Sequence, residues 1–212
     1  LCADHGAVAE GVTQTDSSVT KIVAENFAKG QSTVNCMAEK AGVDVYTIDA
    51  GMKTPVYPEK KLIQRAVIDR KLGMGCGNIA REAAMSVETC ERALQTGEEL
   101  VAGLREMGYT LVATGEMGIG NTTPTSALAA VLLQLSPEEA TGRGAGLDDA
   151  GLERKRQVVE AVCRRVEEKQ IAVGGRVLQP VELLAEAGGF EIAMMAGVFL
   201  GGVKHHVPIV ID

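Results

Sequence analysis

Residues 114–124 read TGEMGIGNTTP, a glycine-rich stretch between a short apolar run and a segment of helix-forming residues. The apolar run, Tyr109–Ala113, is rich in β-forming residues and predicts a buried strand. Pro124 predicts the first position of a helix that Thr122 or Thr123 would cap. Because the first helical turn carries unpaired N–H groups and the positive end of the dipole, the stretch predicts an anion site.

Glu116 lies inside this glycine loop, where a carboxylate would repel a phosphate. Its position indicates either hydroxyl groups to be bound, such as those of a ribose, or a proton to be transferred. The alternative is a simple connection in which Gly115, Gly118 and Gly120 turn the chain and Glu116 is solvated. Glycine motifs alone are not specific, so both interpretations stay open on this pattern.

The composition favours an α/β fold. Glycine accounts for 25 of the 212 residues, and the chain has no Trp, three Phe and three Tyr, so its core must be aliphatic. Small aliphatic residues suit helices that pack closely on parallel strands. The predicted architecture is doubly wound, with a mostly parallel sheet and helices on both faces in a Rossmann-like three-layer arrangement.

Charge and motifs exclude several classes of protein. The net charge is −7 without a basic stripe, which argues against a nucleic-acid partner because phosphate neutralisation dominates such binding. The five cysteines form no CxxC pair and predict buried free thiols in a reducing cytoplasm, not a zinc site. The longest apolar stretch, Ile192–Val203, is too short to span a bilayer, so no membrane partner is expected. P-loop and GxSxG motifs are absent.

Capping residues and apolar spacing predict the other helices and strands. Helices are predicted at residues 18–28, 32–41, 86–108, from 148 onward, 180–187 and 192–202. Strands are predicted at residues 1–3, 43–48, 66–69 and 207–211, and residues 53–61 are predicted to form a surface loop. The long helix after Ser86 leads into the strand at 109–113 and predicts a right-handed βαβ crossover. Glycines 197, 201 and 202 predict that the last helix lies close to another backbone.

Polar residues follow the first predicted strand. Asp4, His5 and Gly6 come directly after it, and Glu10 comes shortly afterwards. Open parallel sheets bind ligands at the carboxyl ends of their strands, which makes these residues candidates for a site. His5 could equally be a loop histidine bonded to the backbone.

A third glycine cluster, TGRGAG at residues 141–146, precedes the helix that begins near Asp148. Lys155 lies in the first turns of that helix. A lysine at this place could reach a phosphate bound by the glycines. The alternative is a solvated lysine without a ligand.

Several motifs together resemble one family, the nicotinate-nucleotide–dimethylbenzimidazole phosphoribosyltransferases. The motifs are CADHGAVAEGVT (2–13), GCGNIAREAAMS (75–86), GEMGIGNTTP (115–124), GRGAGLDD (142–149) with Lys155, GGFEIAMMAGVFLG (188–201) and VPIVID (207–212). The resemblance implies transfer of a phosphoribosyl group from nicotinate mononucleotide to 5,6-dimethylbenzimidazole, which gives α-ribazole phosphate and nicotinate in cobalamin biosynthesis. It also implies a pentosyltransferase that uses no cofactor or metal and acts as a cytoplasmic homodimer.

The same resemblance assigns substrate-binding residues in four groups. The loop that holds ribose and phosphate matches Glu116, Gly118, Gly120, Asn121, Thr122 and Thr123. The surroundings of the phosphate and nicotinate match Gly142, Gly144, Gly146 and Lys155. The strand-end motif matches Asp4, His5, Gly6 and Glu10. Thr15 falls where a small hydroxyl residue lines the acceptor pocket.

The chain also departs from the family. Family members extend beyond both ends, and the glutamate regarded as their catalytic base lies in a segment after Asp212, so no catalytic residue is assigned here. We therefore expect residues 1–212 to form the large nucleotide-binding α/β domain, without the small helical domain that the flanks build. Ala83 replaces a usual proline, and Thr15-Asp16 is atypical near the acceptor pocket, so a related base stays open as acceptor. The alternative function is a non-catalytic ribotide-binding module or a subunit of a split transferase.

Overall fold

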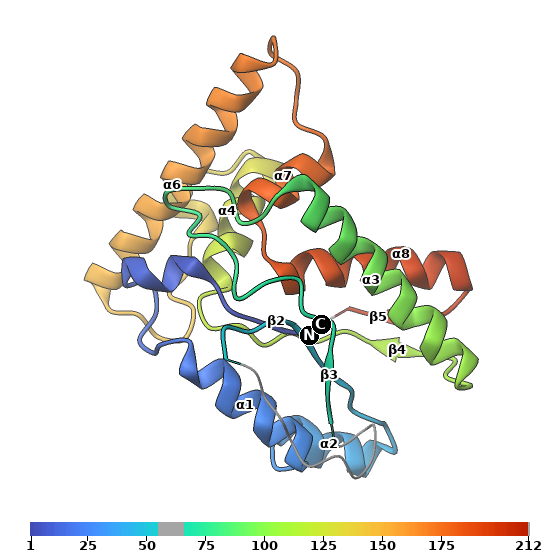
Figure 1. The fold of residues 1–212 in the computed structure, drawn as a ribbon. Helices are drawn as coiled ribbons and strands as arrows, with labels where there is room; N and C mark the ends of the chain where they lie inside the picture. The colour runs from blue at the N-terminus through green and yellow to red at the C-terminus, as the bar shows by residue number, and fades with distance from the viewer. Residues whose placement is uncertain (55–65, 212) are drawn as a thin grey trace.

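The computed structural model describes residues 1–54 and 66–211. Its strands are all parallel (Figure 1). They are β1 (Cys2–Ala3), β2 (Thr47–Gly51), β3 (Val67–Asp69), β4 (Val112–Ala113) and β5 (Ile209–Val210). The first three form one sheet and the last two form another.

A single segment joins the two sheets. Val112 pairs with Ile209 of β5, and five residues further on Met117 forms a parallel bridge with Cys2 of β1. The spatial order is therefore β3, β2, β1, the segment 112–117, and β5. This is the 3-2-1-4-5 order of a doubly wound nucleotide-binding fold.

Helices cover both faces of the strands. In Figure 1, α1 and α2 lie below the strands and α3 and α8 lie above them. The helices are η1 (Gly6–Glu10), α1 (Ser18–Lys29), α2 (Thr33–Ala41), α3 (Val87–Glu106), α4 (Thr122–Leu133), α5 (Pro137–Ala140), α6 (Asp149–Ala172), α7 (Pro180–Ala187) and α8 (Phe190–His205). The predicted α/β architecture with a parallel sheet is confirmed.

Most predicted helix ends are confirmed because their capping groups are local. Ser32 caps α2 through a capping box, and the side chains of Ser86 and Asp148 cap α3 and α6. Gly30 closes α1 in the left-handed conformation that glycine adopts without strain. The start of α4 differs from the prediction: the helix begins at Thr122, so Pro124 is its third residue.

Two predicted strands are wrong in their bounds. The expected buried strand at 109–113 is reduced to β4, and Leu111 is 58% exposed. The reason is that this segment pairs only with β5 before it turns towards β1. The strand expected at 43–48 is β2 instead, which runs through Asp49. Asp49 is tolerated there because its carboxylate accepts the N–H groups of Gly51 and Met52.

The predicted βαβ step is also different. The helix α3 connects β3 to β4, as expected, but the two strands are not neighbours because β2 and β1 lie between them.

The predicted loop at 53–61 falls largely on residues outside those described.

Close packing of α3 and α8 depends on glycine. A Cβ atom at Gly97 would lie 2.1 Å from the carbonyl oxygen of Met194, and one at Gly197 would lie 2.1 Å from that of Leu94. A third glycine, Gly201, would meet the Cα of Glu98 at 2.9 Å. The predicted close approach of the last helix to another backbone is confirmed.

The core is aliphatic, as the composition predicts, and it runs from the strands into α4, α6, α7 and α8. All five cysteines are free thiols, but Cys36 is exposed, so the expectation of buried thiols is wrong for that residue. None of the helices within residues 1–54 and 66–211 combines the length and apolarity needed to cross a bilayer.

Candidate functional site

A cleft with a cavity volume of about 160 Å³ lies at the glycine loop. One wall is the stretch from Glu116 to Thr122, and the other combines residues 12–14 with Ala145 and Leu147. The Gln14 amide donates a hydrogen bond to the carbonyl of Gly146 and so links the two sides. This volume can hold one part of a nucleotide, such as a sugar phosphate, because pockets that enclose whole drug-sized ligands exceed about 300 Å³.

The sheet fixes the glycine loop at this cleft. The N–H of Ala3 donates to the carbonyl of Met117 at 3.1 Å, and the N–H of Met117 donates to the carbonyl of Leu1 at 2.9 Å. Gly118 then crosses β1 so closely that a Cβ atom would lie 2.7 Å from the Ala3 carbonyl oxygen. Gly120 has φ +92, which side chains of L-residues rarely adopt. Both glycines are therefore needed for the shape of the loop.

Inside the loop, the Asn121 amide donates a hydrogen bond to the carboxylate of Glu116. The first turn of α4 is partly satisfied by the loop, since the N–H of Thr123 donates to the carbonyl of Gly120. The helix end therefore offers fewer N–H groups to an anion than the sequence pattern predicts. Glu116 itself is exposed at the cleft, where its carboxylate can meet a ligand.

Lys155 supplies positive charge behind the cleft. It is 1% exposed, and its Nζ donates to Thr122 Oγ1 at 2.8 Å and to the Gly142 carbonyl at 3.1 Å. Within the described residues its hydrogen-bond partners are the Thr122 hydroxyl and the Gly142 carbonyl and not a carboxylate, and burial lowers its pKa. An ammonium has three donors, and these two hydrogen bonds use two of them. The alternative of a solvated lysine is wrong.

Gly144, in the third glycine cluster, packs against Thr122 and Lys155. It has φ +56, and a Cβ atom there would lie 3.0 Å from Thr122 Oγ1 and 3.4 Å from Lys155 Nζ. The cluster at residues 141–146 thus packs directly on the lysine. The structure brings together the glycine loop, Lys155 and this third cluster, which were predicted from separate parts of the sequence.

The predicted residues near the first strand lie elsewhere. Gly6 packs against the backbone of Asn78, and the Glu10 carboxylate accepts hydrogen bonds from Asn78 at 2.6 Å and Arg81 at 2.9 Å. Those two bonds lower the pKa of Glu10. Thr15 is exposed in the turn after Gln14 and is not among the residues that line the cleft. Their assignment to substrate binding stays a prediction.

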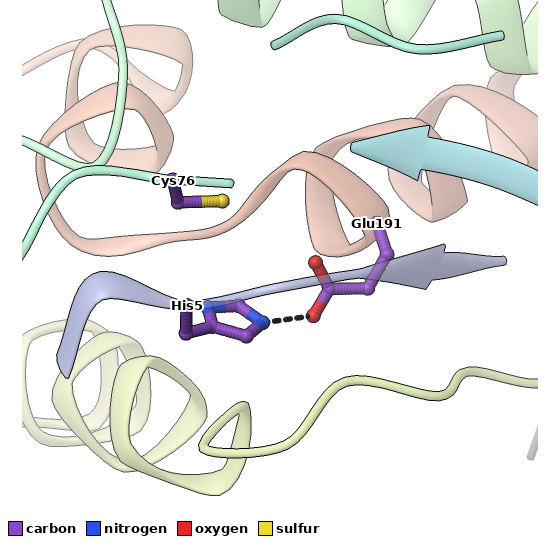
Figure 2. Close-up of side chains that lie close together, drawn as sticks. All are labelled: His5, Cys76 and Glu191. Carbon is purple, nitrogen blue, oxygen red and sulfur yellow. Dashed lines mark hydrogen bonds and ion pairs between the residues drawn. The ribbon is translucent and has the colours of Figure 1, made fainter. Parts of the chain in front are cut away.

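A buried cluster lies beneath the loop, and the sequence did not predict it. His5 Nε2 and Glu191 Oε1 are 2.7 Å apart, with side-chain exposures of 2% and 0%, and Cys76 lies beside them (Figure 2). The Cys76 sulfur accepts a hydrogen bond from the Phe190 N–H. One signal was available, because Glu191 is the one acidic residue in α8, a helix otherwise rich in small and apolar residues. Among the described residues, the His5 ring is therefore paired with a carboxylate and not bonded to the backbone. The assignment of His5 to substrate binding stays a prediction.

The cluster offers atoms of the metal-binding type, all within 4.8 Å of one another. Two ligands of one tetrahedral zinc ion are about 3.3 Å apart, given metal–ligand bonds of about 2.0–2.1 Å. The His5–Glu191 distance of 2.7 Å is shorter and is a hydrogen-bond distance. The residues could hold a metal only if this pair separated.

Charges around His5 decide its protonation. Burial opposes a charge on the imidazole, but attraction to Glu191 and the hydrogen bond that His5 donates to it, with smaller effects of Asp4 and Glu116, raise the pKa of His5 above its ordinary value of 6.5. Protonation of the ring therefore contributes to the free energy of unfolding. This contribution is fully present below pH 6.5 and is lost as the pH rises through the raised pKa.

The fold and this site define a doubly wound α/β domain with a cleft at the carboxyl ends of its strands and a buried lysine behind it. The phosphoribosyltransferase family model matches residues 1–212, and the chain belongs to that family.

Relatives with names match this chain over almost all of its length. A nicotinate-nucleotide–dimethylbenzimidazole phosphoribosyltransferase of Nitratidesulfovibrio vulgaris is 41% identical over 213 residues, which is 100% of this chain and 57% of the relative. One of Thermus thermophilus is 40% identical and matches 99% of this chain and 59% of its own length. A crystal structure of CobT from Thermus thermophilus has a TM-score of 0.89 at 39% identity over 100% of this chain and 60% of its own. The chain spans less than two thirds of the length of these relatives.

Proposed function

We propose that the protein transfers a phosphoribosyl group from nicotinate mononucleotide to 5,6-dimethylbenzimidazole or a related base, as a pentosyltransferase of cobalamin biosynthesis. The observation that carries this proposal is the buried Lys155, which has a donor to spare beside a cleft of sugar-phosphate size. Names of relatives and the family match agree with the reaction class.

The geometry suggests where the phosphate and the ribose of the donor nucleotide would bind in the cleft. Its phosphate would bind at Lys155 and the glycines 142, 144 and 146, because Lys155 donates to the Gly142 carbonyl and Gly144 packs against the lysine, while Gly142 and Gly146 leave open space. Its ribose would lie along the loop, with hydroxyl groups towards the Glu116 carboxylate that Asn121 orients. A sugar carbon that loses its base develops positive charge, and a carboxylate nearby would stabilise it.

The division of the protein stays a proposal as well. Residues 1–212 would be the large nucleotide-binding domain, and the catalytic base would come from a segment outside them. Incubation of residues 1–212 together with that segment, nicotinate mononucleotide and 5,6-dimethylbenzimidazole tests the reaction. Formation of α-ribazole phosphate and nicotinate in equal amounts is expected, and nicotinate release without the second product would contradict the transfer.

We also propose a homodimer and a cytoplasmic location. Apolar side chains exposed along the β4–β5 edge, among them Leu111, Val210 and Ile211, support association of two copies. The buried free thiols Cys2, Cys76 and Cys90 support a reducing compartment. Light scattering of the purified protein would give the mass of the particle in solution.

Gly118→Ala should weaken binding of nicotinate mononucleotide by about 1–2 kcal/mol, because the new Cβ would overlap backbone and push the loop off β1. Gly115→Ala is the matched control in the same loop, since a Cβ there has nothing within 4 Å. Calorimetric titration compares the two variants. Equal affinities would contradict the assigned loop geometry.

A further inference from the structure

The His5–Glu191 pair does not line the cleft and yet packs against the loop that forms it. His5 follows β1, Glu191 lies in the first turn of α8, and the two are joined across 186 positions of the chain. A buried ion pair is costly to desolvate and contributes little to stability compared with apolar packing. Its presence therefore calls for an explanation other than stability.

The pair forms the floor under the glycine loop. A Cβ atom at Gly118 would lie 3.1 Å from His5 Nε2 and 3.3 Å from Glu191 Oε1, the two atoms that share the hydrogen bond. On another side, Gly189 approaches the His5 ring so closely that its Cβ would lie 2.4 Å from Cε1. His5 and Glu191 therefore pack against the backbone of Gly118, and a shift of either side chain towards the loop would displace it.

Acidic groups surround the imidazole from several elements. Glu191 faces it from α8, Asp4 from the end of β1, and Glu116 from the glycine loop, while the Cys76 thiol lies beside the pair. Within the described residues, Glu191 Oε2 and Asp4 Oδ1 are buried without a hydrogen-bond partner. Protonated His5 is thus a positive charge in a strongly negative surrounding, and its loss would leave buried carboxylates uncompensated.

We propose that His5 and Glu191 are a positioning pair for the glycine loop, whose charged and hydrogen-bonded form holds Gly118 and thereby Glu116 and Thr122 in the conformation that binds the donor nucleotide. The inference rests on the proposed function, since nicotinate mononucleotide is the ligand whose affinity reports the state of the loop. It predicts that affinity depends on the protonation of a group that the nucleotide does not touch.

Glu191→Gln tests the proposal with nicotinate mononucleotide as the probe. The dissociation constant at pH 7 is expected to rise about tenfold, because the loop loses its charged support. In the parent protein the affinity should fall as the pH rises through the raised pKa of His5. In Glu191→Gln that fall should move to lower pH, because burial without the anionic partner opposes the charge on His5.

Glu186→Gln is the matched control. Glu186 is also a buried carboxylate, but its partners are Arg165 and Lys169 on α6 and not the glycine loop. This variant is expected to unfold at lower temperature and to bind the nucleotide within about twofold of the parent protein. An equal loss of affinity in both variants would mean that the effect is general destabilisation, which would overturn the proposal.

Three further outcomes are informative. If folded Glu191→Gln binds with the affinity and the pH profile of the parent protein, the proposal is wrong. If Glu191→Gln does not fold, His5→Gln decides, because glutamine can still donate to Glu191 without a charge; weaker binding with a flattened pH profile is expected, and unchanged binding overturns the proposal. If the parent protein itself does not bind nicotinate mononucleotide, the proposed function fails, and so does the inference that rests on it.

Discussion

Lys155→Met is expected to weaken binding of nicotinate mononucleotide by about 1.5–3 kcal/mol, which is roughly 10- to 150-fold. Methionine keeps the apolar stem in its buried position and removes the ammonium group, with its two hydrogen bonds and the charge that would bind the phosphate. Thr122 is exposed at the cleft and Gly142 is exposed as well, so water can replace the lost hydrogen bonds. Calorimetric titration at constant salt measures the effect.

Lys204→Met is the matched control for this change. Lys204 is a surface residue of α8 that pairs with Glu98 at 2.6 Å, away from the cleft. Its substitution should leave the affinity within about twofold, since surface ion pairs contribute little. Similar affinities for Lys155→Met and the parent protein would contradict the phosphate site.

Lys155→Met also has a consequence for the pH dependence of stability. Burial lowers the pKa of Lys155, so the unfolded chain binds more protons than the folded chain between that lowered pKa and the ordinary value of 10.5. The free energy of unfolding of the parent protein therefore gains a contribution as the pH rises through this window. Lys155→Met should lose that contribution and should not be less stable by more than about 1 kcal/mol at pH 7.

Gly197→Ala is expected to lower the free energy of unfolding by about 3 kcal/mol, at the upper end for an overpacked core. The new Cβ would lie 2.1 Å from the Leu94 carbonyl, and helix backbones cannot yield as a side chain can. The two helices would have to move apart, which would disturb the packing of Gly97 on Met194. Urea unfolding monitored by circular dichroism measures the loss.

Gly103→Ala in α3 supplies the control. A Cβ at Gly103 has nothing within 4 Å, so alanine should stabilise that helix by about 0.5–1 kcal/mol. Opposite signs for the two substitutions are expected. A Gly197→Ala protein as stable as the parent would contradict the close contact of α3 with α8.

Local chemistry explains which parts of the fold could be predicted. Ser32 and Ser86 accept hydrogen bonds from residues three positions later, and Gly30 closes its helix by its own backbone conformation. Such signals lie within one helical turn and can be recognised in a sequence. The small-residue pattern of Gly197 and Gly201 was informative for the same reason, although the partner helix was not identified by it.

Strand bounds and buried charges depended on residues far apart in the chain. Asp49 disfavoured a strand by composition, yet two backbone N–H groups satisfy it inside β2. Lys155 could not be recognised as buried until Thr122 and Gly142 were placed around it. The glycine loop and the third glycine cluster were predicted as candidates, whereas their convergence on one cation required the fold.

The pairing of His5 with Glu191 shows the same limit most clearly. The two residues are 186 positions apart, and neither belongs to a motif whose spacing indicates contact. A single acid in the helix of small and apolar residues was the available signal, because a buried charge needs a partner. Gly118 lies between this pair and the cleft. It therefore connects the glycine loop, which the sequence predicted as a site, with the buried pair, which the sequence did not predict.

Calorimetric titration with nicotinate mononucleotide tests whether the cleft is the donor site, with nicotinamide mononucleotide as the comparison ligand. We expect saturable binding with one site per chain, a preference for the nicotinate form, and loss of most of the affinity in Lys155→Met. Absence of binding at millimolar ligand, or equal binding by the parent protein and Lys155→Met, would contradict the assignment of the cleft as the donor site.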